Sequence, residues 1–104
     1  SQAAHAEQEV VNRHLTRSQE ITNQLIDLYG QLALMKGSEL SVRSQTFQSA
    51  LADPKVNVTT AREKAASSVS HYSIEIIKMQ GEIDGLLLAL AHIDRVLNYW
   101  KEVV

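Results

Sequence analysis

Residues 69–104 read VSHYSIEIIKMQGEIDGLLLALAHIDRVLNYWKEVV, and this stretch decides the fold. Apolar residues recur in it at alternating steps of three and four, which places them on one stripe of an α-helix. A stripe with this heptad spacing packs against a partner helix, as in a coiled coil. Its members are Val69, Tyr72, Ile76, Met79, Ile83, Leu86, Leu90, Ile93, Leu97, Trp100 and Val104. We predict a helix from about residue 60 to 102, opened by a capping box of Thr60 and Glu63.

The first half of the chain shows the same period more weakly. Its apolar stripe is continuous only from Ile21 to Met35. Glycines at 30 and 37 lie on the opposite face, and each costs about 1 kcal/mol against alanine, so we expect a bend near Gly37. The helix is predicted to run from about residue 8 to 52. A loop at 53–59 follows, because the proline of Asp53-Pro54 cannot continue a helix.

Composition agrees with an all-α fold. Aromatic residues make up only 5% of the 104 residues, with one proline and four glycines, so turn-rich β-structure is disfavoured. Two helices of similar length joined by a short loop form an antiparallel two-helix hairpin. We therefore expect a single coiled-coil-like hairpin domain over residues 1–104.

A second set of apolar residues lies off the main stripe of the second helix. A lone hairpin leaves such residues without a partner, and Gly81 and Gly85 have the small-xxx-small spacing that lets helix backbones approach closely. The alternative is that the glycines only mark a tolerant surface. We predict a homo-oligomer, most simply a dimer that completes a helical bundle. Its interface is expected to comprise Ile74, Ile77, Gly81, Gly85, Leu88 and Ala91.

Charge is distributed unevenly along the chain. Residues 36–78 carry six basic and four acidic residues, a net +2, which leaves −4 for the remainder of a chain of net charge −2. The overall balance argues against a generally basic nucleic-acid binder. A local contact with nucleic acid or another anionic partner would involve Arg43, Lys55, Arg62 and Lys64. An ordinary solvated surface explains the same residues equally well.

No motif for catalysis is found in the sequence. Cysteine is absent, and no phosphate loop, dinucleotide fingerprint or nucleophile elbow occurs. His5 and Glu9 have the spacing of a metal pair, but no second pair accompanies them. We expect no enzyme activity, metal, cofactor or small-molecule substrate. Tyr99 and Trp100 admit two interpretations: Trp100 fills the core, or the pair forms an exposed aromatic docking site.

Membrane insertion is not expected. The longest apolar run, Leu86 to Ala91, is six residues, whereas crossing a bilayer takes about 20. The start of the sequence, Ser1 to His5, lacks the basic and apolar segments of a signal peptide. We therefore expect a cytoplasmic protein without a membrane partner.

Three segments resemble small helical-hairpin bacteriophage proteins of the recombination-mediator type. These are the pair Leu28-Tyr29 in the first helix, the opening Ala61 to Ala65, and the aliphatic and aromatic end Ile93 to Trp100. The likeness covers most of the chain. It implies an oligomer that helps to load a recombinase onto single-stranded DNA, in the cytoplasm of an infected host.

Three functions are compatible with these features. The leading hypothesis is a non-enzymatic viral assembly or adaptor protein that oligomerises and presents its hairpin tip to a protein partner. The second is a single-stranded DNA-binding accessory protein of recombination or replication. The third is a helical inhibitor that binds a host enzyme.

Overall fold

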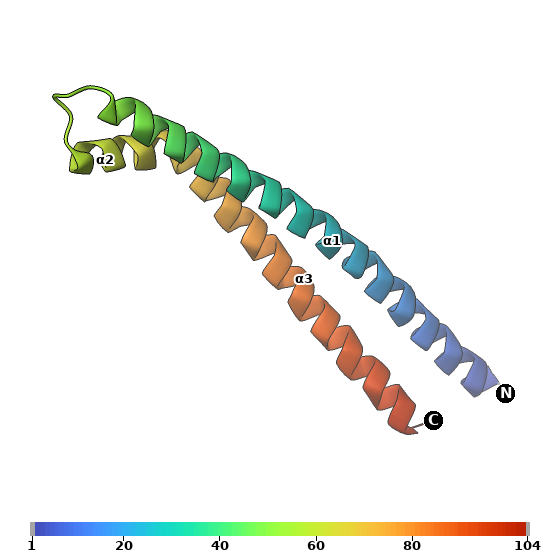
Figure 1. Cartoon of the computed structure of the whole chain (residues 1–104). Helices are drawn as coiled ribbons and strands as arrows, with labels where there is room; N and C mark the ends of the chain where they lie inside the picture. The colour runs from blue at the N-terminus through green and yellow to red at the C-terminus, as the bar shows by residue number, and fades with distance from the viewer. Residues whose placement is uncertain (1, 104) are drawn as a thin grey trace. The chain divides into compact units, whose positions relative to one another are not determined.

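The computed structural model describes residues 2–103, apart from the side chains of Ala3 and Val103. The chain is all-α over this range, and the described residues contain no strand (Figure 1). Helix α1 spans Gln2–Leu51, α2 spans Val58–Ser68 and α3 spans Ser70–Val103.

The chain forms two compact units. Unit 1 consists of Ser1–Tyr29 and Glu82–Val104, and unit 2 consists of Gly30–Gly81. Helices α1 and α3 each contribute residues to both units, whereas α2 belongs to unit 2 alone.

Unit 1 is built from the first part of α1 packed on the last part of α3. Val11 near the start of α1 lines the same crevice as Trp100 near the end of α3, so the two segments run in opposite directions. The described residues of the two predicted stripes are all buried or half-buried here. The prediction for Val104 lies outside the described residues. Four large aliphatic residues are buried: Ile21, Leu25, Ile83 and Ile93.

Unit 2 has a core of smaller side chains. Its buried residues are Leu32 of α1, Ala61 and Ala65 of α2, and Val69 at the junction of α2 and α3. Alanine at two successive seam positions brings little apolar surface into the core, and burial stabilises by roughly 25 cal/mol per Å². The contribution of this core to stability is therefore smaller than that of unit 1.

The loop forms where proline predicted it, and α2 begins two residues earlier than expected. The Asp53 carboxylate accepts a hydrogen bond from the Lys55 amide at 2.9 Å, a local turn that follows the end of α1. Asn57 then caps α2, because its Oδ1 accepts the Thr60 N–H at 2.8 Å. The predicted capping role of Thr60 was wrong, since asparagine supplies the required oxygen three residues earlier.

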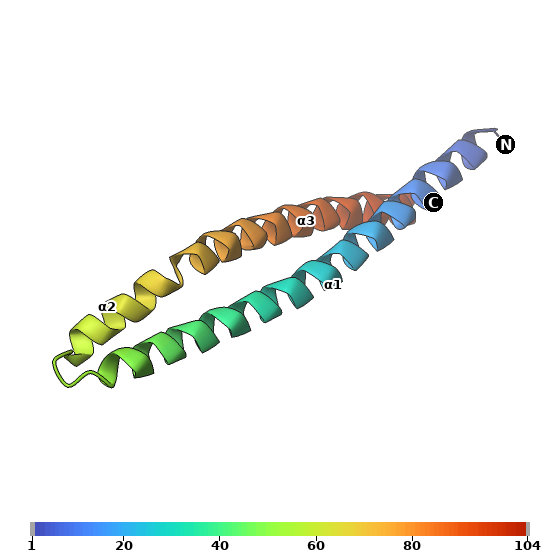
Figure 2. The ribbon, with the colours of Figure 1, turned by 90° about the horizontal axis from the view of Figure 1, so that it is seen from above.

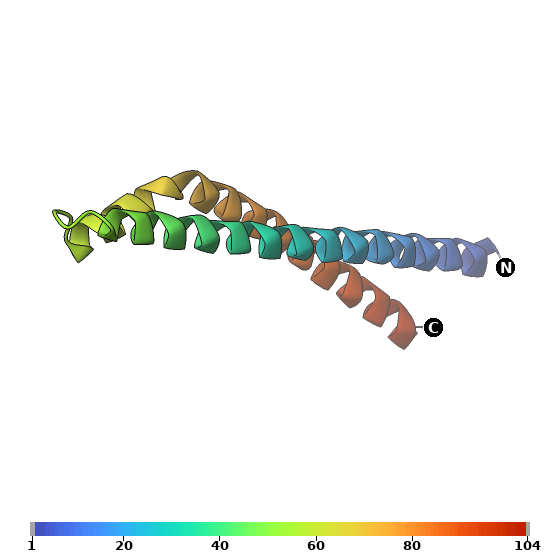
Figure 3. The ribbon, with the colours of Figure 1, turned by 45° about the horizontal axis from the view of Figure 1, so that its top comes forward.

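Two other boundary predictions were also wrong: the start of the first helix near residue 8 and an unbroken second helix from about residue 60. Helix α1 begins at Gln2 and continues without interruption through Gly37, as its unbroken ribbon shows (Figure 3). The predicted second helix is interrupted at Val69, where the ribbon between α2 and α3 narrows (Figure 2). A glycine in a helix costs free energy without preventing the helix, whereas serine side chains compete for backbone groups.

Serines surround the interruption at Val69. Ser68 Oγ donates to the Ala65 carbonyl at 2.6 Å, and Ser70 Oγ donates to the Ser67 carbonyl at 3.1 Å. The Val69 amide bonds to the carbonyl three residues earlier, that of Ala66, at 3.4 Å. The helix therefore tightens and ends here, and α3 restarts one residue later.

Candidate interaction surfaces

Exposed apolar side chains are the most prominent surface feature. Among the described residues, eight hydrophobic residues are buried, while twelve large hydrophobic residues are exposed. Isolated exposed apolar residues are common in proteins, but contiguous groups of them mark interaction sites. The exposed apolar side chains of each unit are therefore candidate contact surfaces.

The predicted interface residues of α3 are all at the surface. Ile74, Ile77 and Leu88 are 56%, 68% and 73% exposed. Ala91 is exposed as well. A Cβ atom added at Gly81 or Gly85 would meet no atom within 4 Å, so neither glycine accommodates a close neighbour within this chain.

Unit 1 has two open crevices, each lined by residues of both α1 and α3. One, of about 510 Å³, has a mainly apolar lining with charged residues in it, formed by Ala4, Glu7, Gln8, Val11, Leu15, Leu97, Trp100 and Lys101. The crevice residues Gln8 and Leu15 are spaced seven apart on α1, so they share one side of that helix.

The second crevice of unit 1, of about 480 Å³, is lined by both polar and apolar residues. Gln24, Asp27 and Leu28 of α1 meet Glu82, Gly85 and Leu86 of α3 there. Gly85 therefore lines the same crevice as the carboxylates of Asp27 and Glu82. The sequence pattern did not predict this grouping.

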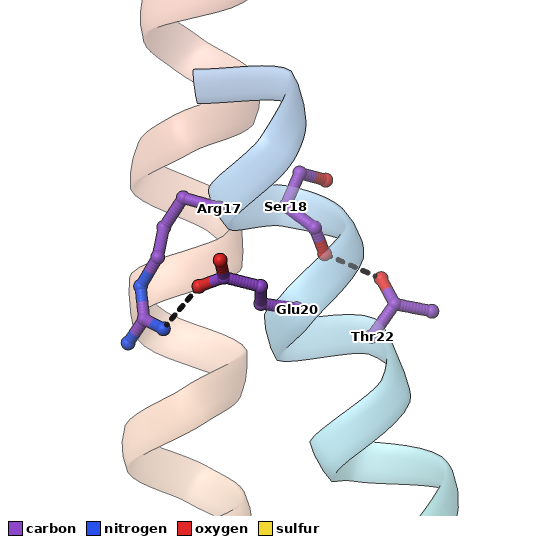
Figure 4. Close-up of polar contacts among 4 residues, drawn as sticks. All are labelled: Arg17, Ser18, Glu20 and Thr22. Carbon is purple, nitrogen blue, oxygen red and sulfur yellow. Dashed lines mark hydrogen bonds and ion pairs between the residues drawn. The ribbon is translucent and has the colours of Figure 1, made fainter. Parts of the chain in front are cut away.

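Charged residues of α1 line both crevices of unit 1, Glu7 the first and Asp27 the second. Arg17 Nη1 donates to Glu20 Oε2 at 3.1 Å, and both side chains point away from Thr22 (Figure 4). The Thr22 hydroxyl donates back to the Ser18 carbonyl at 2.8 Å (Figure 4). The hydroxyl is therefore satisfied within the helix.

Unit 2 contains the largest of these crevices, an open groove of about 570 Å³ between α1 and α2. We call it the unit 2 groove. It has apolar walls and a charged rim, the composition typical of sites that accept a helix or peptide from another protein. It is lined by Leu40, Arg43, Ser44, Phe47, Thr59, Arg62, Glu63, Ala65 and Ala66.

The structure brings together two of the four predicted anion-contacting residues. Arg43 and Arg62 both line the unit 2 groove. Lys55 lies exposed in the loop, and Lys64 is exposed on α2 outside the groove lining. Arg43 forms an ion pair with Glu39, whose side chain is only 13% exposed. The charge of Arg43 is therefore compensated within α1.

The two aromatic candidates at the end of α3 differ in environment. Tyr99 is 59% exposed, whereas Trp100 is half-buried in the apolar crevice of unit 1. Their rings meet edge to face with centroids 5.7 Å apart. Trp100 thus contributes both to the seam and to an accessible crevice.

His5, which has the spacing of a metal-ligand pair with Glu9, lies close to the carboxylate of that residue. His5 Nε2 lies 3.3 Å from Glu9 Oε1, and both side chains are exposed. No group of three or more metal-ligating side chains occurs among the described residues. In the described part of the chain, no helical stretch combines the length and hydropathy that crossing a membrane requires.

Helix α1 exposes apolar residues that the sequence pattern did not single out as a surface. Leu15, Ile26 and Tyr29 in unit 1 are 52%, 67% and 49% exposed, and Leu40 in unit 2 is 62% exposed. A seven-residue spacing links Leu40 with Phe47, which also lines the unit 2 groove. Applying the heptad test to every face of the first helix would have found these residues.

No family model, curated protein or solved structure matches this chain.

Proposed function

We propose that this chain is a non-enzymatic helical assembly protein that associates with itself and presents unit 2 to a protein partner. In this proposal α1 pairs with α2 and α3 as an antiparallel coiled-coil-like hairpin, and association of copies completes a helical bundle. A cytoplasmic location, in an infected host for a viral protein, belongs to the same proposal.

One observation carries the proposal: the described residues expose more large apolar side chains than they bury apolar residues. Helix-to-helix association covers such surface and gains roughly 25 cal/mol per Å² removed from water. Two layers of helices are the minimal arrangement that encloses a helical core. Self-association would therefore cover the apolar surface that a single chain leaves exposed to water.

The unit 2 groove supports the adaptor part of the proposal. Arg62 lines it and has no ion-pair partner among the described residues, while Leu40 and Phe47 supply apolar surface. A helix with an apolar face and charges complementary to Arg62 and Glu63 matches this lining, because burial provides affinity and the two charges set the orientation.

Native mass in solution tests the proposal. Sedimentation velocity or light scattering over a range of concentrations is expected to show a dimer or a higher oligomer. A protein that remains monomeric at the highest concentration reached would refute self-association.

Single-stranded DNA binding is the second candidate function. The observation that favours it is the net charge of +2 on unit 2, with Lys55, Arg62 and Lys64 unpaired among the described residues. Phosphate contacts weaken steeply with salt because counterions are released. Fluorescence anisotropy of a labelled oligonucleotide should then show binding at low salt that is lost as salt rises, and no binding at 50 mM salt would refute this function.

A further inference from the structure

We propose that α2 opens as one cooperative segment of unit 2 while α1 and α3 remain helical. The segment lies between the connection at 52–57 and the interruption at Val69, and all of it belongs to unit 2. Proteins open locally in cooperative units, and a unit that buries few apolar contacts opens most easily. The motion occurs within one chain, so it goes beyond the proposed self-association and does not depend on it.

Helix α2 contributes little apolar surface to the core of unit 2. Its buried residues are Ala61 and Ala65, each of which has a single methyl group as its side chain. The one large aliphatic residue of this helix, Val58, is 56% exposed. Burial stabilises in proportion to the apolar area removed from water, so these side chains hold α2 only weakly against α1.

The polar contacts of α2 lie within the helix or at its cap. Asn57 Oδ1 accepts the Thr60 amide, and Ser68 Oγ donates to the Ala65 carbonyl. None of the ion pairs among the described residues includes a charged residue of α2. Separating α2 from α1 therefore breaks no ion pair between described residues. Once separated, a helix of 11 residues is too short to persist in water, so α2 unfolds as it opens.

Both ends of α2 allow it to open without its neighbours. Residues 52–57 before it are already non-helical. After it, Val69 has non-helical backbone angles, φ −115° and ψ 11°. The Val69 carbonyl accepts the amides of Tyr72 and Ser73 at 3.0 and 3.2 Å, so the first turn of α3 is held by Val69. The side chain of Val69 is fully buried, which keeps this end in place when α2 opens.

The unit 2 groove lies against the segment that opens. Leu40 and Phe47 of α1 line one of its walls, and Arg62 and Ala66 of α2 line the other. Opening of α2 removes the second wall and leaves the first in place. The groove of about 570 Å³ therefore has one fixed wall and one movable wall, and it exists only in the closed form of unit 2.

Native-state amide hydrogen exchange of the full chain, at fixed protein concentration, tests the proposal. After correction for intrinsic rates, the α2 amides are expected to share one opening constant and to exchange at least roughly tenfold faster than the α1 amides of unit 2. Equal protection in the two helices would overturn the proposal, because both would then exchange through the same unfolding event.

Two alanine-to-glycine variants separate opening of α2 from unfolding of the whole of unit 2. Ala33 of α1 and Ala66 of α2 are both exposed, and glycine at either position lowers the equilibrium constant for forming its helix about fivefold. Ala66→Gly should speed exchange of all the α2 amides by that factor. Ala33→Gly should speed exchange of the α1 amides of unit 2 and leave the α2 amides unchanged, because α1 stays helical when α2 opens. Faster exchange of the α2 amides in Ala33→Gly would overturn the proposal, as would an Ala66→Gly effect confined to single amides.

Discussion

The two units fill the seams between their helices with different side chains. Unit 1 buries four large residues, Ile21, Leu25, Ile83 and Ile93, whereas unit 2 buries two large residues, Leu32 and Val69, with two alanines, Ala61 and Ala65. Large branched side chains interlock and remove much surface from water, while alanine lets helices approach with little burial. The same architecture can therefore be firmly packed in one unit and thinly packed in the other.

The two units also differ in net charge. Unit 1 has a net charge of −4 and unit 2 has +2. Within the proposed function, the firmly packed acidic unit holds the assembly, and the thinly packed basic unit meets the partner. Regions with small cores open more readily, and binding regions are often drawn from them.

The largest expected effect tests the core of unit 1. Leu25→Ala removes a side chain that is 6% exposed and should lower the free energy of unfolding by about 2–5 kcal/mol, the range for leucine deletions in packed cores. Urea denaturation followed by circular dichroism at fixed protein concentration measures the change. Leu34→Ala is the matched control, because Leu34 is 76% exposed. Equal losses for the two variants would mean that Leu25 is not in a packed core.

The next effect tests whether alanine in unit 2 reflects close helix approach. Ala65 is 3% exposed, so Ala65→Leu should overpack the seam and cost about 1–3 kcal/mol in the same urea experiment. Ala66→Leu places the same side chain at an adjacent exposed position and should be nearly neutral. A more stable Ala65→Leu protein would show instead that the seam contains unfilled space.

A smaller effect tests the start of α2. Asn57→Ala removes the oxygen that accepts the Thr60 amide and should destabilise the protein by about 1 kcal/mol, as loss of an N-cap does. Thr60→Ala, which removes the hydroxyl of the capping box predicted from sequence, should cost less. The same denaturation measurement separates the two assignments, and a larger loss for Thr60→Ala would favour the capping box.

Periodicity predicted the elements that depend on many residues. The apolar stripe from Ile83 to Trp100 is buried or half-buried at every position in unit 1, and the loop forms at Asp53-Pro54. These features could be read from sequence because burial every three or four residues and the geometry of proline act locally. The strip of α3 that includes Ile74 and Leu88 is exposed, while its role as an interface stays a prediction.

The features that sequence could not supply depend on contacts between elements. Arg43 and Arg62 meet in one groove because α1 and α2 pack together, and no spacing along the chain shows this. The pairing of Arg43 with Glu39 leaves only Arg62 as an unpaired cation among the described residues of that groove. Lys55 and Lys64 lie outside the groove lining, and a contact of the four basic residues with an anionic partner stays a prediction.

The smallest expected effect concerns the interruption at Val69. Ser68→Ala removes the hydroxyl that donates to the Ala65 carbonyl, and alanine has the higher helix propensity, so stability should change by less than about 0.5 kcal/mol. The sharper measurement is amide hydrogen exchange, which should slow at Val69 and Ser70 if the serine competes with the helical bonds. Ser73→Ala is the control, because Ser73 is exposed and lies beyond the interruption. Unchanged exchange in Ser68→Ala would mean that the packing of Val69, which is fully buried, causes the interruption. The difference in packing between the two units would then arise from their core residues alone.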